Sequence, residues 1–282
     1  MKDDTLTLAD DLVLTRMGYG AMQLAGPGVF GPPRDRAEAV RVLRTVVDLG
    51  ITHIDTSEAY GPVVTNEIIR EALHPYPADL RLVSKIGARR GADGSWNRSD
   101  DLREQLLDNL AQLGVDVLDA VNLRAMSEEP IGELFAATVA LQKEGLVRHV
   151  GLSNVTAAQV AEAREIAPIV FVQNLYNVAH RTDDALIDSL AAGGIGYVPF
   201  FPLGGFTPLQ SDTLARVAAS LGASPQQTAL AWLLQRSPNV LVIPGTSAVA
   251  HLHENVAAAD LELPAEALAQ LDTIQGSWSP AH

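Results

Sequence analysis

The feature that most constrains the fold of this chain is an alternation of short apolar runs with longer amphipathic runs. The apolar runs, such as IVFVQ at 169–173 and VLVIP at 240–244, have the Val- and Ile-rich composition of strands buried on both faces. The run at 39–47 places its apolar residues at helical spacing. Strands that alternate with helices favour a parallel sheet covered by helices. Because eight strand-helix units fit the 282 residues, the sequence predicts one domain, 1–282, folded as a (β/α)8 or TIM barrel.

The expected elements are delimited by typical start and stop residues, such as Pro or Ser at helix starts and Gly at helix ends. An opening hairpin or plug and a first strand are expected before residue 23, and later strands at 51–55, 80–85, 117–123, 148–152, 169–173, 195–200 and 240–244. Helices are expected at 35–49, 65–73, 99–113, 131–143, 156–166, 183–192, 214–221, 225–235, 248–258 and 264–274, with Ser99 capping the third. The Gly-containing segments 24–33 and 87–97 are predicted to be loops.

Composition excludes several classes of function. The net charge of -14 argues against nucleic acid or an anionic membrane as the main partner. The chain has no Cys, which excludes disulfides, thiol catalysis and Cys-ligated metals. His180, His251 and His253 lack the three or four clustered ligands that zinc needs, so no metal site is predicted. The acidic N-terminus is not a signal peptide and no apolar run is long enough to span a membrane, so we expect a soluble cytoplasmic protein.

One stretch, HIDTSEAYG at 53–61, starts as an apolar strand and ends in a polar turn. Asp55 and Tyr60 therefore follow the carboxyl end of one expected strand, and Lys85 ends the next. In a barrel these ends point to the same place, so the three side chains can share one pocket. An ammonium group beside a phenol stabilises the phenolate, and a carboxylate keeps the ammonium charged and in place. The trio is a candidate general acid that can act near neutral pH.

Polar residues also follow the ends of the other expected strands. They are Asn122, Arg124, Ser153, Asn154, Gln173, Asn174, Tyr176, residues 200–205 and residues 244–247. Any one of them is more often structural than functional, but a purely structural barrel does not need so many amides and charges at one end. The ring as a whole favours an active site.

Two further groups of side chains have weaker signals. Arg89 and Arg90 are more typical of a solvated surface than of a pocket, although either can steer an anionic substrate at the pocket mouth. Trp96 and Phe30 are expected in loops at the rim, where an aromatic side chain either binds a flat substrate or fixes its own loop. These four residues are therefore not included among the expected site residues.

Taken together, the motifs at the strand ends resemble the aldo-keto reductase family. The matching segments are IDT-x3-YG at 54–61, Lys85, GLSN at 151–154, VQN-x-YN at 172–177, PLGG at 202–205 and IPGTS…EN from 243 to 255. They follow the family's order and spacing from about residue 18 to the last helix, and the combination is specific although GLSN or PLGG alone is weak. Within the family, long stretches such as GYGAMQLAGPGVFGPPRDR and YVPFFPLGGFTPLQ are similar to the bacterial pyridoxal reductases.

The resemblance implies a reductase that uses a nicotinamide cofactor, usually NADPH in this family. It implies Tyr60 as the proton donor to the carbonyl oxygen, Lys85 as its charged partner and Asp55 as the anchor of Lys85. The implied cofactor contacts are Ser153, Asn154 and Gln173 at the carboxamide, Phe200 on the nicotinamide ring, Leu203, Gly204 and Gly205 at the pyrophosphate, and Gly245, Thr246, Ser247, His251, Glu254 and Asn255 toward the adenosine end.

Two positions depart from the family pattern. The usual fourth catalytic residue is a His at the end of strand four, and this chain has Arg124 there. Arg stays charged and cannot relay a proton, but it can polarise the carbonyl, stabilise an alkoxide or bind an anionic or phenolate group of the substrate. Arg124 therefore stays in the expected catalytic set. His251 stands where many members have an Arg on the 2′-phosphate, which weakens the expected preference for NADPH over NADH.

The expected activity is the reduction of an aldehyde, with pyridoxal to pyridoxine as the leading pair, by NADPH or by NADH as a second donor. The expected partner is a small molecule, and the protein is expected to be a monomer or a weak homo-oligomer. Two alternatives stay open. Another carbonyl compound, such as a sugar or a natural-product intermediate, can be reduced by the same machinery, or the chain is an NADP(H)-binding regulator with little turnover.

Overall fold

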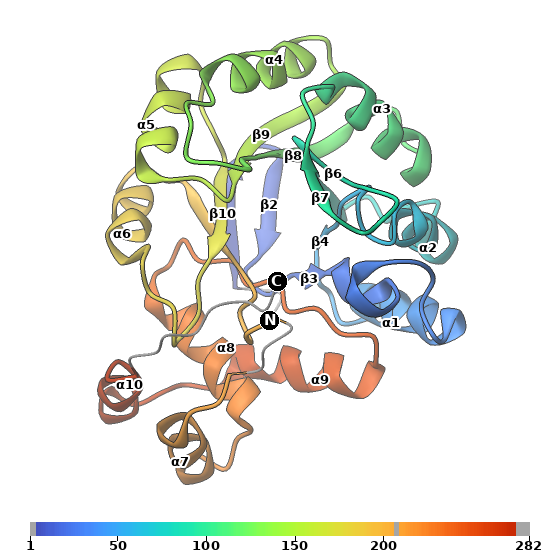
Figure 1. Cartoon of the computed structure of the whole chain (residues 1–282). Coiled ribbons are helices and arrows are strands. Elements are labelled where there is room, and N and C mark those ends of the chain that lie inside the picture. Colours follow the sequence, from blue (N-terminus) through green and yellow to red (C-terminus); the bar gives the residue numbers. More distant parts are fainter. Residues whose placement is uncertain (1–3, 206–208, 275–282) are drawn as a thin grey trace.

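The central element of the computed structural model, which describes residues 4–205 and 209–274, is a seven-stranded parallel sheet. The strands lie side by side in the order in which they occur along the chain (Figure 1). They are β3 (Tyr19–Gly20), β4 (His53–Asp55), β5 (Arg81–Ile86), β8 (Leu118–Arg124), β9 (Val147–Ser153), β10 (Phe171–Leu175) and β11 (Gly196–Phe200). A sheet built by successive crossovers of one hand curls in one direction, which brings its first and last strands together.

The segment 240–243 lies between the two edge strands of the sheet, β3 and β11, and takes the place of the eighth strand. On one side, Leu241 N donates a hydrogen bond to Tyr197 O at 2.9 Å, next to β11. On the other side, Gly18 N donates to Val242 O at 2.8 Å, next to β3. Parallel bridges accompany both contacts. The sheet is therefore closed, and the prediction of a (β/α)8 barrel is confirmed.

Helices surround the barrel, as Figure 1 shows. They are α1 (Arg36–Asp48), α2 (Val64–Leu73), α3 (Leu102–Leu113), α4 (Gly132–Lys143), α5 (Ala157–Ile166), α6 (Asp184–Ala192), α7 (Asp212–Ser220), α8 (Pro225–Arg236), α9 (Val249–Ala257) and α10 (Ala265–Leu271), with short 3-10 turns at Ala21–Leu24, Pro27–Val29 and Ala258–Asp260. The expected cap at Ser99 is wrong, because Asp101 accepts from Glu104 N and begins α3. Within the described residues, none of these helices is long and apolar enough to cross a membrane.

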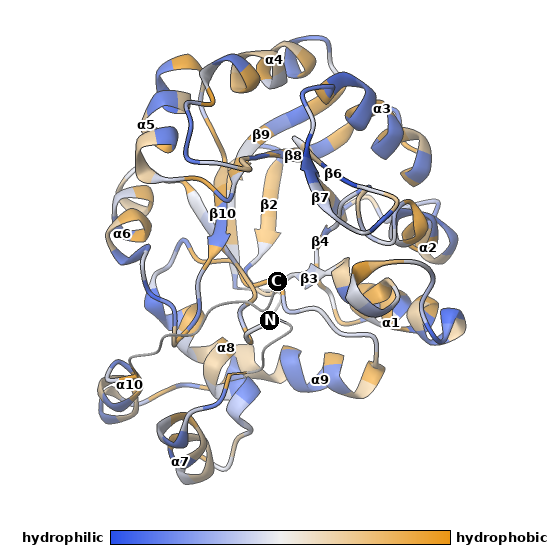
Figure 2. Cartoon of the chain, in the orientation of Figure 1, coloured by the Kyte–Doolittle hydropathy of each residue, from blue (hydrophilic) through white to orange (hydrophobic). Residues whose placement is uncertain are grey.

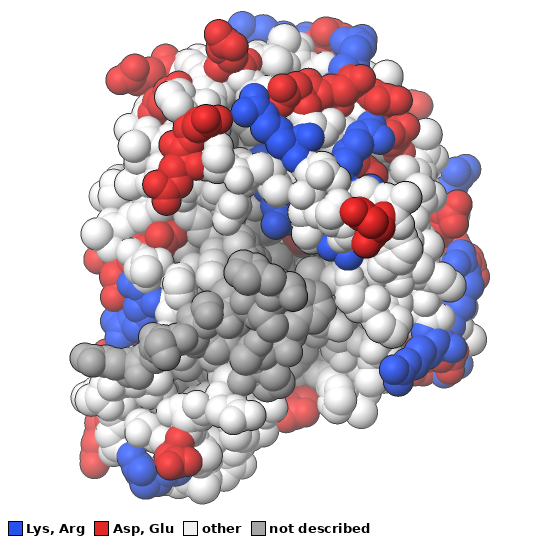
Figure 3. Space-filling view, viewed as in Figure 1, with Lys and Arg blue, Asp and Glu red and all other residues white. Residues whose placement is uncertain are grey.

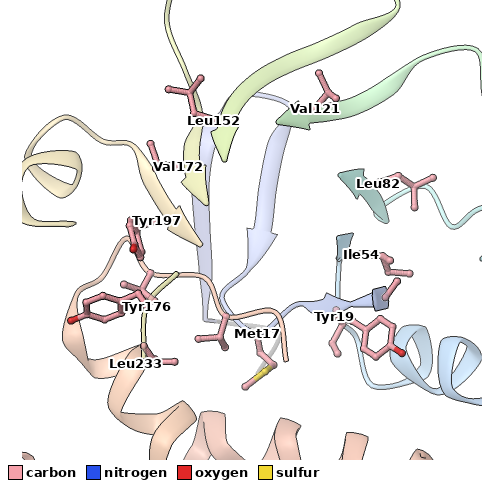
Figure 4. Packing of buried hydrophobic residues seen from close by; sticks show 14 of the residues in the cluster. Met17, Tyr19, Ile54, Leu82, Val121, Leu152, Val172, Tyr176, Tyr197 and Leu233 are labelled. Carbon is pink, nitrogen blue, oxygen red and sulfur yellow. The ribbon is translucent and has the colours of Figure 1, made fainter. Parts of the chain in front are cut away.

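Two layers of apolar side chains hold the barrel and its helices together. Strand residues that point outward, such as Leu82, Val121 and Leu152, belong to one apolar cluster with residues of the helices (Figure 4). Figure 2 shows that the surrounding helices carry both apolar and polar residues. Strand residues that point inward, such as Val83 and Phe171, form a second cluster inside the barrel. Because side chains alternate between the two faces along a strand, every second residue of each strand faces the barrel interior as far as the carboxyl end of that strand.

A hairpin of β1 (Thr5–Ala9) and β2 (Leu12–Thr15) covers the amino end of the barrel. Leu12 and Leu14 on β2 are fully buried against the inward apolar cluster. This confirms the expected opening plug. The hairpin thus fills the amino end of the barrel, and the pocket described below lies at the carboxyl end.

A second hairpin corrects the prediction for 87–97, which was a loop. Residues 88–90 form β6 (Ala88–Arg90) and residues 96–98 form β7 (Trp96–Arg98), an antiparallel pair with Arg90 opposite Trp96. Strands of three residues are too short to show an alternating apolar pattern, which is why the sequence did not indicate them. The hairpin follows β5 and extends over the carboxyl end of the barrel (Figure 1).

Candidate active site

A pocket opens at the carboxyl end of the barrel, where the last inward-facing residue of each strand lies. The two-residue period of the strands brings Asp55, Lys85 and Arg124 to its wall from β4, β5 and β8. The expected site residues that line it are Asp55, Tyr60, Lys85, Arg124, Ser153, Gln173, Phe200, Leu203, Gly205 and Gly245. The structure thus brings together residues from the whole length of the chain.

Lys85 and Asp55 form a buried ion pair at the floor of this pocket. Lys85 Nζ lies 2.5 Å from Oδ1 of Asp55 and also donates to Thr56 O at 3.0 Å. Both side chains are almost fully buried. Burial alone lowers the pKa of Lys85, but Asp55 and the phenol oxygen of Tyr60 outweigh it and raise the pKa above its usual value. Lys85 is therefore a fixed positive charge at neutral pH.

Tyr60 lies directly beside that charge, with Lys85 Nζ 5.2 Å from the centroid of its ring. Its backbone is held in the turn between β4 and α2, because Tyr60 N donates to Ser57 O and Tyr60 O accepts from Thr65 N. The side chain is buried except for a small part that faces the pocket. A phenol beside a permanent positive charge can give up its proton and leave a stabilised phenolate.

Gln173 connects the ion pair to the opposite wall of the pocket. Its Nε2 donates to Oδ2 of Asp55 at 2.9 Å, so both oxygens of that carboxylate have a partner. Its Oε1 is buried and has no partner. Ser153 is its register neighbour on β9, and Phe200 on β11 adds an aromatic wall. An unpaired acceptor beside an aromatic wall is complementary to a planar ligand that has an N–H donor.

Arg124, Trp96 and Arg90 form a stack on the hairpin side of the pocket. Cζ of Arg124 lies 4.6 Å from the centroid of the Trp96 ring, and Cζ of Arg90 lies 4.8 Å from it. All three residues line the pocket. Figure 3 shows basic side chains, interleaved with acidic ones, on the side of the molecule where Figure 1 places β6 and β7. The sequence indicated a solvent-exposed position for Arg90, and either loop fixation or substrate binding for Trp96. Neither residue was therefore among the expected site residues.

The segment 24–33 supplies further lining residues that the sequence analysis did not single out. Gly28 and Val29 reach the pocket, and Phe30 forms a bridge with Gly61, next to Tyr60. Val29 has a positive φ of 60°, which a β-branched residue adopts only under strain. The Gly- and Pro-rich composition was the only available signal for a loop of this kind.

Several expected cofactor contacts lie away from the pocket wall. Asn154 is exposed and its Nδ2 donates to Ala125 O at 2.8 Å. Gly204 is buried between two lining residues. The remaining ones follow Gly245 on the loop before α9 and on α9 itself, and are Thr246, Ser247, His251, Glu254 and Asn255. Among the described residues, no group of three or more His, Asp or Glu is placed to hold a metal ion.

The start of α9 has a partner on a distant helix that no sequence pattern indicates. Oε1 of Glu38, on α1, accepts from Val249 N at 3.1 Å and so binds the first turn of the helix. This hydrogen bond and Arg41 lower the pKa of Glu38 below its usual value. A carboxylate at this place satisfies the positive end of the helix dipole.

The fold and this site together are those of an oxidoreductase built on a (β/α)8 barrel. The sequence pattern of the Aldo/keto reductase family matches residues 16–275. The chain belongs to the aldo/keto reductase family. It is 62% identical to the Pyridoxine 4-dehydrogenase of Escherichia coli (strain K12), over 97% of this chain and 99% of that protein. It is 39% identical to an uncharacterized oxidoreductase of Schizosaccharomyces pombe, over 93% of this chain and 87% of that one.

Solved structures of the family have the same architecture. A thermostable aldo-keto reductase crystallised with the inhibitor epalrestat superposes with a TM-score of 0.81 at 31% identity, covering 93% of this chain and 96% of that chain. An aldo/keto reductase from Klebsiella pneumoniae, crystallised with NADP and acetate, superposes with a TM-score of 0.80 at 26% identity, covering 99% and 96%. The agreement extends over nearly all of each chain.

Proposed function

We propose that the protein interconverts pyridoxal and pyridoxine, with NADPH as its preferred cofactor. The observation that supports this most is the 62% identity to a pyridoxine 4-dehydrogenase over almost the full length of both chains. Oxidation of the 4-hydroxymethyl group of pyridoxine gives the aldehyde pyridoxal, so the same site performs reduction in the reverse direction. A flat aromatic substrate also suits a pocket with walls formed by Phe200 and Trp96.

In this proposal the residues of the pocket act on the carbonyl oxygen. Tyr60 donates a proton to it during reduction and takes the proton back during oxidation. Lys85 stabilises the phenolate that Tyr60 leaves, and Asp55 holds Lys85 charged and in position. Arg124 lines the same pocket as Tyr60 and adds positive charge near the developing alkoxide.

The bound cofactor supplies the hydride. The unpaired Oε1 of Gln173 would accept from the carboxamide N–H of a nicotinamide, and Ser153 and Phe200 line the same pocket. Asn154 is the third proposed carboxamide residue, although its Nδ2 donates to Ala125 O outside the pocket wall. We propose that Leu203, Gly204 and Gly205 bind the pyrophosphate, with the backbone N–H groups of Leu203 and Gly205 as donors. Gly204 N donates to Phe201 O at 3.0 Å and so holds the turn. The proposed adenosine contacts are Gly245, Thr246, Ser247, His251, Glu254 and Asn255. Two Klebsiella pneumoniae relatives crystallised with NADP or NADPH support the choice of cofactor.

All the proposed site residues come from one chain, which supports activity as a monomer or within a weak homo-oligomer. The use of an intracellular coenzyme supports the cytoplasm as the place of action. The net charge of -14 makes nucleic acid an unfavourable partner, and its absence from the function stays a prediction.

The test is the oxidation of NADPH at 340 nm by the purified protein with pyridoxal, beside NADH and a panel of small aldehydes. We expect pyridoxal to be reduced with the highest kcat/KM of the panel, and pyridoxine to be oxidised in the reverse assay with NADP+. If another aldehyde of the panel has a higher kcat/KM, that aldehyde replaces pyridoxal as the proposed substrate, and the proposed reduction mechanism is retained. Tight NADPH binding without turnover of any aldehyde would instead indicate a regulator.

A further inference from the structure

Within residues 4–205 and 209–274, neither Arg124 nor Arg90 forms an ion pair with a carboxylate, in a chain that has many more carboxylates than cations. The more distant charge of Asp93 acts on Arg90 and partly offsets the lowering of its pKa by burial. Nε of each arginine is buried without a hydrogen-bond partner. Among the described residues, the Arg90 guanidinium donates one hydrogen bond, to the backbone oxygen of Gly28 at 2.8 Å. The charged or ionisable neighbours that affect Arg124 are Tyr60 and Arg90, neither of which is a carboxylate. The chain therefore keeps two like charges close to each other, which is unfavourable unless an anion compensates them.

Other arginines of the same segment show that carboxylate partners are available nearby. Arg89 pairs with Glu104 and Asp108, and Arg98 pairs with Asp100. Arg89 precedes Arg90 directly and Arg98 lies on the strand that pairs with β6. The difference is that Arg90 and Arg124 face the pocket, and Arg89 and Arg98 do not line it. Of these four arginines, the two without an ion pair are thus the two that line the pocket.

Trp96 fixes the directions of both groups. Both guanidiniums contact its ring, with Cζ of Arg124 at 4.6 Å and Cζ of Arg90 at 4.8 Å from the ring centroid. Stacking on an aromatic face leaves the in-plane N–H groups of a guanidinium free to bind oxygen atoms in a fork. Arg124 and Tyr60, the proposed proton donor, line the same pocket, and Tyr60 raises the pKa of Arg124 against the lowering by burial. An oxyanion held by Arg124 must therefore lie close to the carbonyl oxygen that Tyr60 protonates.

We propose that Arg124, held by Trp96 and Arg90, binds a deprotonated ring hydroxyl next to the aldehyde, so that the enzyme selects ortho-hydroxy aromatic aldehydes. This inference rests on the proposed reduction of an aromatic aldehyde and names the class of aldehyde. In such a substrate the phenolate oxygen and the carbonyl oxygen lie side by side on one edge of the ring. One guanidinium fork can bind both oxygens, and Tyr60 then protonates the carbonyl oxygen as the alkoxide forms.

The experiment compares two aldehydes that differ by one group, 3-hydroxypyridine-4-carbaldehyde and pyridine-4-carbaldehyde, with the cofactor-loaded protein. In the wild type we expect kcat/KM to favour the hydroxylated aldehyde by about 10- to 100-fold, as for a hydrogen bond to a charged group. In Arg124→Met this preference falls to nearly one, mainly through loss with the hydroxylated aldehyde. Arg124→Lys keeps the charge without the fork and is expected to lie between the two.

Binding without reaction gives a second readout. 4-Deoxypyridoxine retains the ring hydroxyl but has no carbonyl group, and calorimetric titration measures its Kd. We expect Arg124→Met to weaken its binding by about tenfold or more, as for the loss of a charged hydrogen bond. Arg98→Met is the matched control, because Arg98 belongs to the same hairpin, pairs with Asp100 outside the pocket and leaves both readouts unchanged. Circular dichroism checks that each variant is folded.

The outcomes separate this inference from the function on which it rests. If the wild type reduces both aldehydes with equal kcat/KM, or if Arg124→Met lowers both equally while the Kd for 4-deoxypyridoxine stays constant, the anion site is refuted and the reductase stands. If the wild type reduces neither aldehyde and does not reduce pyridoxal, the proposed function itself fails. A preference that is lost only in the pocket variants supports the assignment.

Discussion

The carboxylate of Asp55 lies 2.5 Å from Nζ of Lys85 through one oxygen and 2.9 Å from Nε2 of Gln173 through the other. One buried side chain therefore connects the proposed proton-donating side of the pocket to the proposed nicotinamide side. It keeps Lys85 charged, and it turns the Gln173 amide so that its oxygen is left for a ligand. A change at Asp55 is expected to disturb both sides.

We predict that Asp55→Asn lowers kcat by at least about 10²-fold, because the fixed charge beside Tyr60 is no longer supported. It is also expected to lower the free energy of unfolding by about 3–5 kcal/mol, since Lys85 becomes a buried charge without a partner. Steady-state kinetics and urea denaturation measure the two effects. Asp35→Asn, which retains a capping side chain at α1, is the control and should change neither. Normal turnover in Asp55→Asn would exclude the proposed role of the pair.

Tyr60→Phe removes one oxygen and keeps the ring that packs beside Lys85. We expect kcat to fall by about 10²–10⁴-fold because the proposed proton donor is lost, with NADPH binding unchanged. Single-turnover reduction and quenching of protein fluorescence by NADPH measure the two quantities. Tyr76→Phe is the matched control, because the Tyr76 hydroxyl donates only to Leu113 O, outside the pocket. If Tyr60→Phe turns over at the wild-type rate, another group donates the proton.

The parts of this site that the sequence predicted are those fixed by the strand period. Asp55 and Lys85 end neighbouring apolar runs, so their position at one rim follows once a barrel is assumed. Gln173 was also expected at the rim, but its bond to Asp55 joins residues 118 positions apart, and only the closed barrel defines that contact.

The parts that the sequence did not predict depend on short or irregular backbone. The hairpin of β6 and β7 has strands of three residues, and nothing in ARRGADGSWNR distinguishes Arg90, which lines the pocket, from Arg89, which is ion-paired. The contacts of the Arg90 and Arg124 guanidiniums with the Trp96 ring depend on tertiary packing, which the sequence pattern does not show. The contact between Glu38 and the start of α9 is of the same kind, because it connects the first helix to the ninth.

A pH dependence of stability is expected from His53, which is 2% exposed on β4 and has an Nδ1 without a partner. Burial lowers the pKa of His53 from 6.5 to about 4. The unfolded chain therefore binds a proton below pH 6.5 that the folded protein does not bind until about pH 4. The free energy of unfolding thus falls as the pH decreases through this window, by up to about 3 kcal/mol.

Urea denaturation at several pH values between 7.5 and 4 tests this, with His53→Gln beside the wild type. We expect the variant to be less stable at pH 7.5, where a packed ring is lost, and the gap to narrow as the pH falls. His253→Gln, at an exposed position, is the control and should follow the wild type at every pH. A gap of constant size between the wild type and His53→Gln would show that His53 does not titrate in this window.

Cofactor preference is expected to depend on the charges around α9. In the proposed function, the 2′-phosphate of NADPH lies near this helix, where His251 is exposed and the Glu38 carboxylate already binds Val249 N. His251→Arg adds a permanent positive charge to bind the phosphate, and Glu38→Gln removes a negative charge that repels it. Each change is expected to raise the ratio of kcat/KM for NADPH over NADH by about tenfold. His253→Arg, two residues from His251, is the control for added charge in general. If the ratio of kcat/KM for NADPH over NADH stays at the wild-type value in both variants, the 2′-phosphate lies elsewhere. The proposed adenosine contacts on α9 are then refuted as well.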